Sequence, residues 1–164
     1  MRKILVLLAA AAVVLAGGVV YAAAAADPDV AITRVNYNAV GADTTGNRWQ
    51  EAIYLRARAD LAEPLDVGGW TVHDSYTSAS GEHTNAYTFP AGTVVKPNGL
   101  IVVSPAAGVN KTDPNATQLY YMDFKRGYRG HFINNGGDTL ALDDEDGNQV
   151  ARFSFDFDNG YYVR

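Results

Sequence analysis

The chain has 164 residues and no cysteine, and its 18 acidic and 13 basic side chains give a formal net charge of −5 at pH 7. The lack of cysteine excludes a fold stapled by disulfides, so an apolar core has to hold the chain together. The acidic balance disfavours nucleic acid as a partner, because like charges repel at long range.

The N-terminal residues have the pattern of a secretory signal peptide. Two basic residues, Arg2 and Lys3, precede an unbroken apolar or glycine run over residues 4–20. The sequence Ala24-Ala25-Ala26 before Asp27 satisfies the small-residue rule for cleavage. We therefore expect a signal peptide helix over this segment and a secreted, extracellular product, and the short signal is typical of bacteria.

Removing residues 1–26 leaves residues 27–164, which is a suitable length for one domain. This domain keeps all 18 acidic residues and 11 of the basic ones, so its net charge is −7. The alternative is an uncleaved membrane anchor, because residues 4–26 are long enough to span a bilayer. With cleavage, we expect no membrane span. The absence of cysteine excludes a lipid-anchored lipoprotein.

Short alternating apolar runs, separated by turn signals, predict an all-β sandwich or barrel. In the first run, Val30 and Ile32 share one face, whereas Val35 and Tyr37 have the opposite parity. This change of phase predicts a β-bulge near Thr33-Arg34. The expected strands lie at 30–37, 53–57, 70–73, 86–89, 93–95, 100–103, 119–122, 131–133, 139–142 and 150–157.

The segments between these runs are polar or rich in turn residues. We expect loops at 38–48, 74–85 and 104–118. Lys96-Pro97-Asn98-Gly99 and Asp146-Gly147-Asn148 have good turn chemistry. Asn159-Gly160 predicts a type I′ hairpin that pairs residues 155–158 with residues 161–163.

Four motifs, in order, resemble the lamin-tail domain family. They occupy residues 51–55, 67–74, 87–90 followed by the 96–99 turn, and 119–121 followed by 132–142. The chain departs from the family pattern at Ala52, at Phe132 and in a longer polar loop over 75–85. The resemblance spans residues 30–155 and implies an immunoglobulin-like β-sandwich. It also implies a binding or tethering role, since bacterial members are secreted, alone or beside hydrolase domains.

Three residues, Trp70, Gly137 and Asp138, are expected to have structural roles. Trp70 could present an exposed ring to a sugar or peptide, but a large aromatic at the start of an apolar strand favours the sandwich core. Asp138, which follows Gly137 at a strand start, could be a catalytic carboxylate. Asp side chains commonly accept hydrogen bonds from backbone N–H groups in turns, which favours a structural role instead.

The acidic turn after residue 142 is a weak calcium candidate. Asp143, Asp144 and Asp146 concentrate oxygen ligands there, and calcium prefers oxygen. The alternate spacing and the bidentate Glu of a calcium loop are missing, so solvated turn charges are the preferred interpretation. His73, His83 and His131 are too scattered to suggest zinc. We expect no cofactor.

The best binding candidate is a basic and aromatic patch formed by Lys125, Arg126, Tyr128 and Arg129. Such residues can hold phosphates and stack on bases, although a solvated loop has the same composition. No serine has the glycine pattern of a nucleophile elbow, so the sequence does not indicate an enzyme.

We therefore expect an exported, non-catalytic and monomeric module that binds a protein or a cell-envelope polymer through its loops. The alternatives are a secreted hydrolase or its accessory domain, and a calcium-stabilised adhesion domain.

Overall fold

The computed structural model describes residues 27–37, 51–78, 81–122, 133, 137–156 and 161–163, with the backbone alone for 75–78, 81–84, 156 and 161–163. Every regular element in these ranges is a β-strand. The strands are β1 (Val30–Asn36), β2 (Ala52–Ala57), β3 (Leu65–Asp66), β4 (Thr71–Ser78), β5 (Gly81–Thr88), β6 (Val94–Val95), β7 (Leu100–Ser104), β8 (Gln118–Tyr121), β9 (Gly137–Asp143), β10 (Gln149–Asp156) and β11 (Tyr161–Val163).

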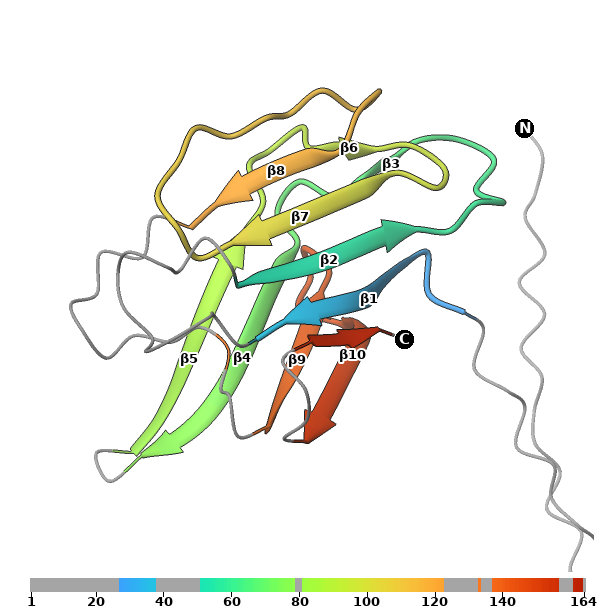
Figure 1. The fold of residues 1–164 in the computed structure, drawn as a ribbon. Helices are drawn as coiled ribbons and strands as arrows, with labels where there is room; N and C mark the ends of the chain where they lie inside the picture. The colour runs from blue at the N-terminus through green and yellow to red at the C-terminus, as the bar shows by residue number, and fades with distance from the viewer. Residues whose placement is uncertain are drawn as a thin grey trace, which may run out of the picture.

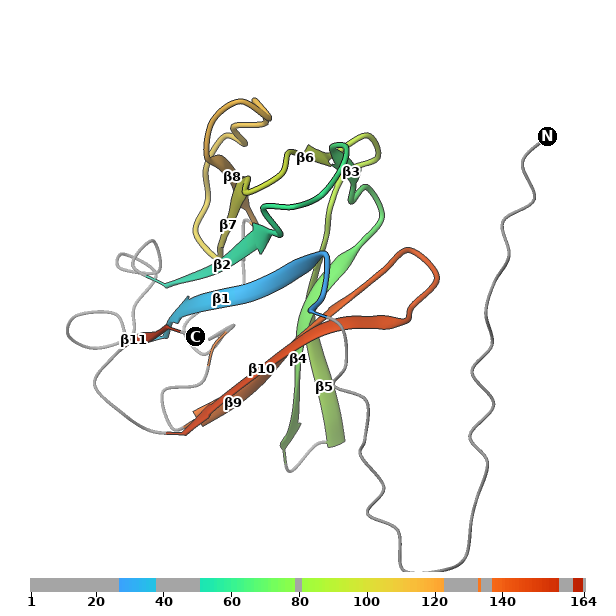
Figure 2. The ribbon, with the colours of Figure 1, turned by 90° about the vertical axis from the view of Figure 1, so that its right-hand side faces the viewer.

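Two large sheets form the body of the molecule. The first sheet has five strands in the order β11-β1-β2-β7-β8, and the second has four in the order β10-β9-β4-β5. The strands β3 and β6 form a separate small sheet of two strands. Figures 1 and 2 show the two large sheets packed face to face, with their strands crossing at an angle. The predicted immunoglobulin-like β-sandwich is therefore confirmed.

The change of side-chain phase in β1 is produced by a bulge. The register of β1 against β2 shifts between Ile32 and Arg34, at the predicted position. One extra residue lets the side chains on both sides of the bulge point inward. Val30, Ile32, Val35 and Tyr37 are all buried as a result.

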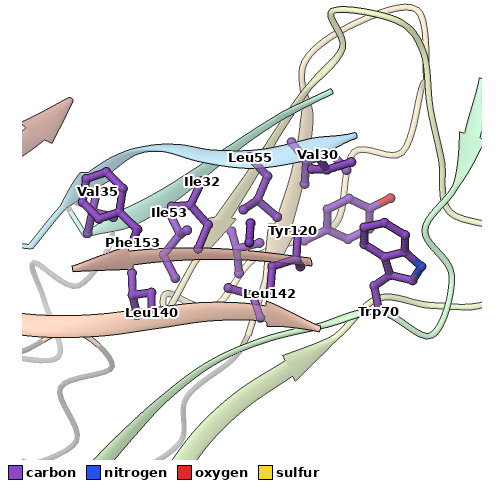
Figure 3. Close-up of a cluster of buried hydrophobic side chains, with 14 of the residues drawn as sticks. Val30, Ile32, Val35, Ile53, Leu55, Trp70, Tyr120, Leu140, Leu142 and Phe153 are labelled. Atoms are coloured by element: carbon purple, nitrogen blue, oxygen red, sulfur yellow. The ribbon is translucent and has the colours of Figure 1, made fainter. Parts of the chain in front are cut away.

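The core lies between the two sheets and consists of inward-facing apolar side chains. Figure 3 shows Ile32 of β1 and Leu55 of β2 pointing toward Leu142 of β9 and Phe153 of β10. Trp70 closes one end of this cluster and is 9% exposed. Burial of these alternating side chains is the main favourable contribution to folding.

Aromatic rings pack at both ends of the core. Tyr37 stacks on Phe155 with ring centroids 4.6 Å apart. Phe89 meets Tyr120 edge to face at 5.3 Å and Tyr87 at 5.4 Å. Such contacts add to the stability that comes from burial alone.

The prediction of a polar loop over residues 74–85 is wrong. Residues 74–78 and 81–85 form the distal parts of β4 and β5, which pair in register from Thr71↔Thr88 to Ser78↔Gly81. The segment has few apolar residues, so hydropathy gave no strand signal. Its Ser, Thr and Tyr residues nevertheless suit a pleated strand, and pairing in a hairpin satisfies the backbone.

The predicted hairpin at Asn159-Gly160 is also wrong. β11 pairs with β1, from Arg34↔Val163 to Asn36↔Tyr161, so the chain crosses from the second sheet to the first after β10. A turn dipeptide is a local signal and does not determine which strand the next segment joins. In this fold, β11 covers the edge of β1.

The long connection after β7 has a topological cause. β7 and β8 are parallel, so the chain has to return along the whole sheet before β8 begins. Residues 105–117 make this crossing, in agreement with the predicted surface loop (Figure 1). Lys111 forms an isolated antiparallel bridge with Leu119, which covers part of the outer edge of β8.

Several sequence predictions fall largely outside the described ranges, and one of them is the loop expected at 38–48. The signal peptide over residues 1–26 lies outside them, and so does most of the strand expected at 131–133, of which only Ile133 is described and is buried. Within the described ranges there is no helix of the length and apolarity needed to cross a membrane.

The sandwich core predicts a clear contrast between the two faces of the first sheet. Leu55 is 1% exposed and points inward, whereas Val102 lies partly exposed on the outer face. We expect Leu55→Ala to lower the free energy of unfolding by about 2–5 kcal/mol because it leaves a cavity. Val102→Ala should cost much less, and urea unfolding of both variants measures the difference. Equal losses would contradict the assignment of faces.

Candidate functional site

An open groove of about 520 Å³ lies at one end of the outer face of the first sheet. Arg56 of β2 forms one side, residues 96–100 between β6 and β7 form the second, and residues 114–117 before β8 form the third. We call it the Arg56–Lys96 groove. Its three segments are far apart in sequence and meet because β2 and β7 are neighbouring strands.

The 96–100 wall is a rigid turn. Asn98 has a φ of 60°, in the left-handed region that Asn tolerates better than most residues. The Gly99 N–H donates to the Lys96 carbonyl at 2.7 Å, and a Cβ on Gly99 would lie 2.7 Å from the same oxygen. Arg56 Nη1 donates to both the carbonyl and the Oδ1 of Asn98, each at 3.0 Å.

The opposite wall is also held by its own hydrogen bonds. The Asn115 backbone N–H and Nδ2 both donate to Asp113 Oδ1 at 2.9 Å. These bonds, and to a smaller extent the charge of Lys96, hold the pKa of Asp113 below its ordinary value. Lys96 Nζ donates to Asn115 Oδ1, so one cationic side chain links the two walls.

The charge lining the groove is positive. Arg56 and Lys96 are exposed cations, and no acidic side chain of the described residues lines the groove. Asp113 interacts with Lys96 but is not part of the lining. The groove is therefore a cationic feature on a chain whose net charge is −5.

A second groove of about 320 Å³ lies on the other side of Pro114. Residues 90–94, Thr112 and Tyr120 complete its lining. Tyr120 supplies its only ionisable group, and its hydroxyl donates to Gln118 Oε1 at 2.9 Å. This groove offers no charge for a ligand.

The outer face of the first sheet continues away from the Arg56–Lys96 groove. Tyr54 lies two residues before Arg56 on β2, and the Arg34 guanidinium carbon stands 4.9 Å from its ring centroid. Arg34 Nε donates to Asn36 Oδ1 at 2.9 Å, and Asn36 Nδ2 donates to the Tyr54 hydroxyl at 3.3 Å. This face is polar and ordered by side-chain contacts.

The basic and aromatic patch predicted from the sequence lies outside the described residues. Lys125, Arg126, Tyr128 and Arg129 all fall between Met122 and the isolated residue Ile133. Their role remains a prediction.

The structure describes all three residues for which structural roles are expected. The indole of Trp70 is part of the core, and Asp138 Oδ1 accepts a hydrogen bond from the Thr139 backbone N–H at 2.7 Å. Gly137 has a φ of 108°, which a residue with a Cβ would adopt only with strain.

The sequence interpretation missed a buried carboxyl group at Asp74. It is 1% exposed and accepts hydrogen bonds from the Asn85 backbone N–H at 3.0 Å and from Asn85 Nδ2 at 3.2 Å. Burial raises its pKa to about 6, and the charge of Asp138 adds to the effect, while the Asn85 bonds oppose it. The alternation of side chains along the strand could have revealed the burial of Asp74, because Trp70, Val72 and Asp74 lie on the same face.

His73 and Asp143 form a pair on the outer face of the second sheet. His73 Nε2 lies 2.9 Å from Asp143 Oδ2, and both side chains are about three-quarters buried. His73 Nδ1 is buried without a hydrogen-bond partner. Nε2 faces Asp143 and Nδ1 is buried, so neither ring nitrogen is placed to exchange a proton with a nucleophile or a substrate at the surface.

The acidic turn between β9 and β10 is organised by its own hydrogen bonds. Asp144 Oδ1 accepts from the backbone N–H groups of Asp146 at 3.0 Å and of Asn148 at 2.8 Å, and Asn148 Nδ2 donates to Asp144 Oδ2 at 2.9 Å. The Asn148 bonds chiefly lower the pKa of Asp144. Over the described ranges, no three His, Asp or Glu side chains gather as metal ligands would.

Asp74 predicts an unusual pH dependence. Since its pKa is higher in the folded state, about 6 against 3.8, the folded protein holds a proton that the unfolded chain releases. Stability should therefore rise as pH falls through 6, by up to about 3 kcal/mol once pH is below 3.8. Asp74→Asn should remove this rise. Urea unfolding from pH 7 to pH 4 compares the two proteins, and identical pH profiles would contradict the assignment.

The Asp144 turn predicts insensitivity to calcium. Its carboxylate oxygens already accept hydrogen bonds from Asp146 and Asn148, and those bonds would compete with metal binding. We expect the same melting temperature in excess calcium and in excess chelator, because a ligand of the folded state would raise it. Thermal unfolding measures this temperature. A higher melting temperature in calcium would contradict the prediction and support the alternative of a calcium-stabilised adhesion domain.

The comparisons with known proteins agree with the motif-based resemblance. The family model Lamin Tail Domain matches residues 23–156, a range that contains every strand from β1 to β10. The search of curated proteins found no relative that matches. The family is one of non-enzymatic immunoglobulin-like interaction domains. With the fold and the motif order in agreement, the chain belongs to the lamin tail domain family.

Proposed function

We propose that this protein is an exported, non-catalytic binding module that recognises a protein or a polymer of the cell envelope. The observation that carries the proposal is that the grooves of the described residues lie at the surface and not between the sheets. The interior between the sheets is filled with apolar side chains, and the described grooves open at the surface, between turns. Loops and turns on a rigid scaffold are the usual place for specificity.

The chemistry of the described side chains supports binding over catalysis. His73 lies close to Asp143, and this contact leaves the second ring nitrogen buried. The buried carboxyl of Asp74 accepts hydrogen bonds from Asn85, and Asp138 Oδ1 accepts one from the Thr139 backbone N–H, as expected of groups that order the backbone. An acid–base mechanism needs groups that reach a substrate in the correct geometry.

Export rests on the sequence. The basic pair, the apolar run and the alanine cleavage site have the order of a secretory signal. A fold that holds without cysteine needs no particular redox compartment and is compatible with an oxidising one. Recovery of the protein from culture medium with Asp27 as its first residue would support both cleavage and export.

The predicted basic patch gives the direct test of binding. We expect protein recovered from the medium to bind an isolated cell-envelope fraction in a sedimentation assay. Changing Lys125, Arg126 and Arg129 together to Glu should weaken this binding at least tenfold, because each reversal removes an attraction and adds a repulsion.

The matched control changes Lys111, an exposed cation of the 105–117 segment, to Glu. It should leave envelope binding unchanged. If the triple variant binds as well as the wild type, the patch has no role. If the wild-type protein does not bind the envelope fraction at all, the proposed function is wrong.

A further inference from the structure

We propose that the Arg56–Lys96 groove binds an anionic polysaccharide, with Arg56 and Lys96 holding its carboxylate or phosphate groups. This inference rests on the proposed function and names both the site and the ligand class for it. It places recognition on described turns of the sandwich, apart from the predicted patch at residues 125–129.

The donors of Arg56 are arranged to receive an anion. Its recorded hydrogen bonds use only Nη1, and both acceptors are neutral oxygens of Asn98. These bonds fix the guanidinium at the groove while its other nitrogens keep their N–H groups for a ligand. A fixed guanidinium suits bidentate contact with a carboxylate or phosphate.

Lys96 supplies the second positive charge. Its ammonium group has three N–H donors, and the recorded bond to Asn115 Oδ1 uses one of them. The bond also anchors the side chain between the two walls, so less side-chain entropy is lost on binding. Asp113 reduces the field of Lys96 but lies outside the lining, which leaves the groove itself without a carboxylate among the described residues.

The remaining lining suits sugar rings. Asn98, Asn115 and Thr117 provide amide and hydroxyl groups that pair with sugar hydroxyls. Pro97 and Pro114 provide flat apolar surface between these polar groups. The groove is open at the surface, so a polymer can pass through it.

Two observations argue against other polymers. Among the described residues, no aromatic ring lines the groove, so a nucleic acid would lack the base stacking on which single-strand binding depends. Among the described residues, Val109 is the one large apolar side chain that is clearly exposed, at 85%. The described surface therefore lacks the apolar patch typical of a protein-binding surface.

Binding to defined polymers tests the inference. We expect the secreted protein to bind immobilised polygalacturonate or a phosphorylated mannan, and the two arms distinguish carboxylate from phosphate as the preferred anion. Neutral dextran should not bind. Arg56→Gln and Lys96→Gln should each weaken affinity about tenfold, the usual loss when a hydrogen bond to a charged group is removed.

Matched variants separate specific contacts from general charge. Arg56→Lys keeps the charge but loses the planar fork, so its affinity should fall between those of wild type and Arg56→Gln. Lys111→Gln makes the same charge change outside the groove and should bind like wild type. Arg56, Lys96 and Lys111 are all exposed, and loss of a bond to Asn98 or Asn115 should lower the melting temperature only slightly, so every variant should remain folded in the binding assay.

Three outcomes would overturn the inference. They are failure to bind both anionic glycans, unchanged affinity in Arg56→Gln and Lys96→Gln, and binding of polyglutamate or single-stranded DNA as tight as that of the glycans. If the double variant of Arg56 and Lys96 binds the cell-envelope fraction as tightly as wild type does, the groove fails while the binding module stands. If wild type binds neither the fraction nor any glycan, both proposals fail.

Discussion

The exclusion of water from the layer between the two sheets is the constraint on which the rest of the structure depends. With no cysteine to staple the chain, the burial of side chains such as Ile53, Leu55 and Leu142 has to offset the entropy lost on folding. Each strand must therefore keep its apolar parity facing inward. The bulge between Ile32 and Arg34 restores that parity within β1, and thereby brings both Val30 and Val35 into the core.

This same constraint places the described grooves at the turns. A filled interior has no room for a ligand, so the grooves form where connections of unequal length meet above the sheet. The parallel pairing of β7 and β8 forces residues 105–117 to cross the molecule, and this crossing raises a wall opposite the 96–100 turn. Side-chain bonds to Asn98 and Asn115 then hold both walls in place.

Much of the fold could be predicted from local sequence, because period-two alternation and turn chemistry are local. They gave the strands at Ile53 and Leu100, the bulge and the Lys96 turn. Two features depend on distant residues and could not be predicted: the partner of β11, and the groove itself, whose lining comes from separate segments. The strand character of residues 75–78 and 81–85 was missed for another reason, because their pairing is local but their side chains give no apolar alternation. Asp74 was missed because a polar residue in a polar stretch suggests solvent, although its parity places it inside.

The pairing of β11 with β1 has a consequence for the order in which the protein can fold. The edge of β1 is covered by residues 161–163, so the first sheet is incomplete until these residues have been synthesised. Contacts this distant in sequence form slowly, because a long loop must close first. For a chain exported as we propose, the first sheet would be completed only after residues 161–163 have crossed the membrane.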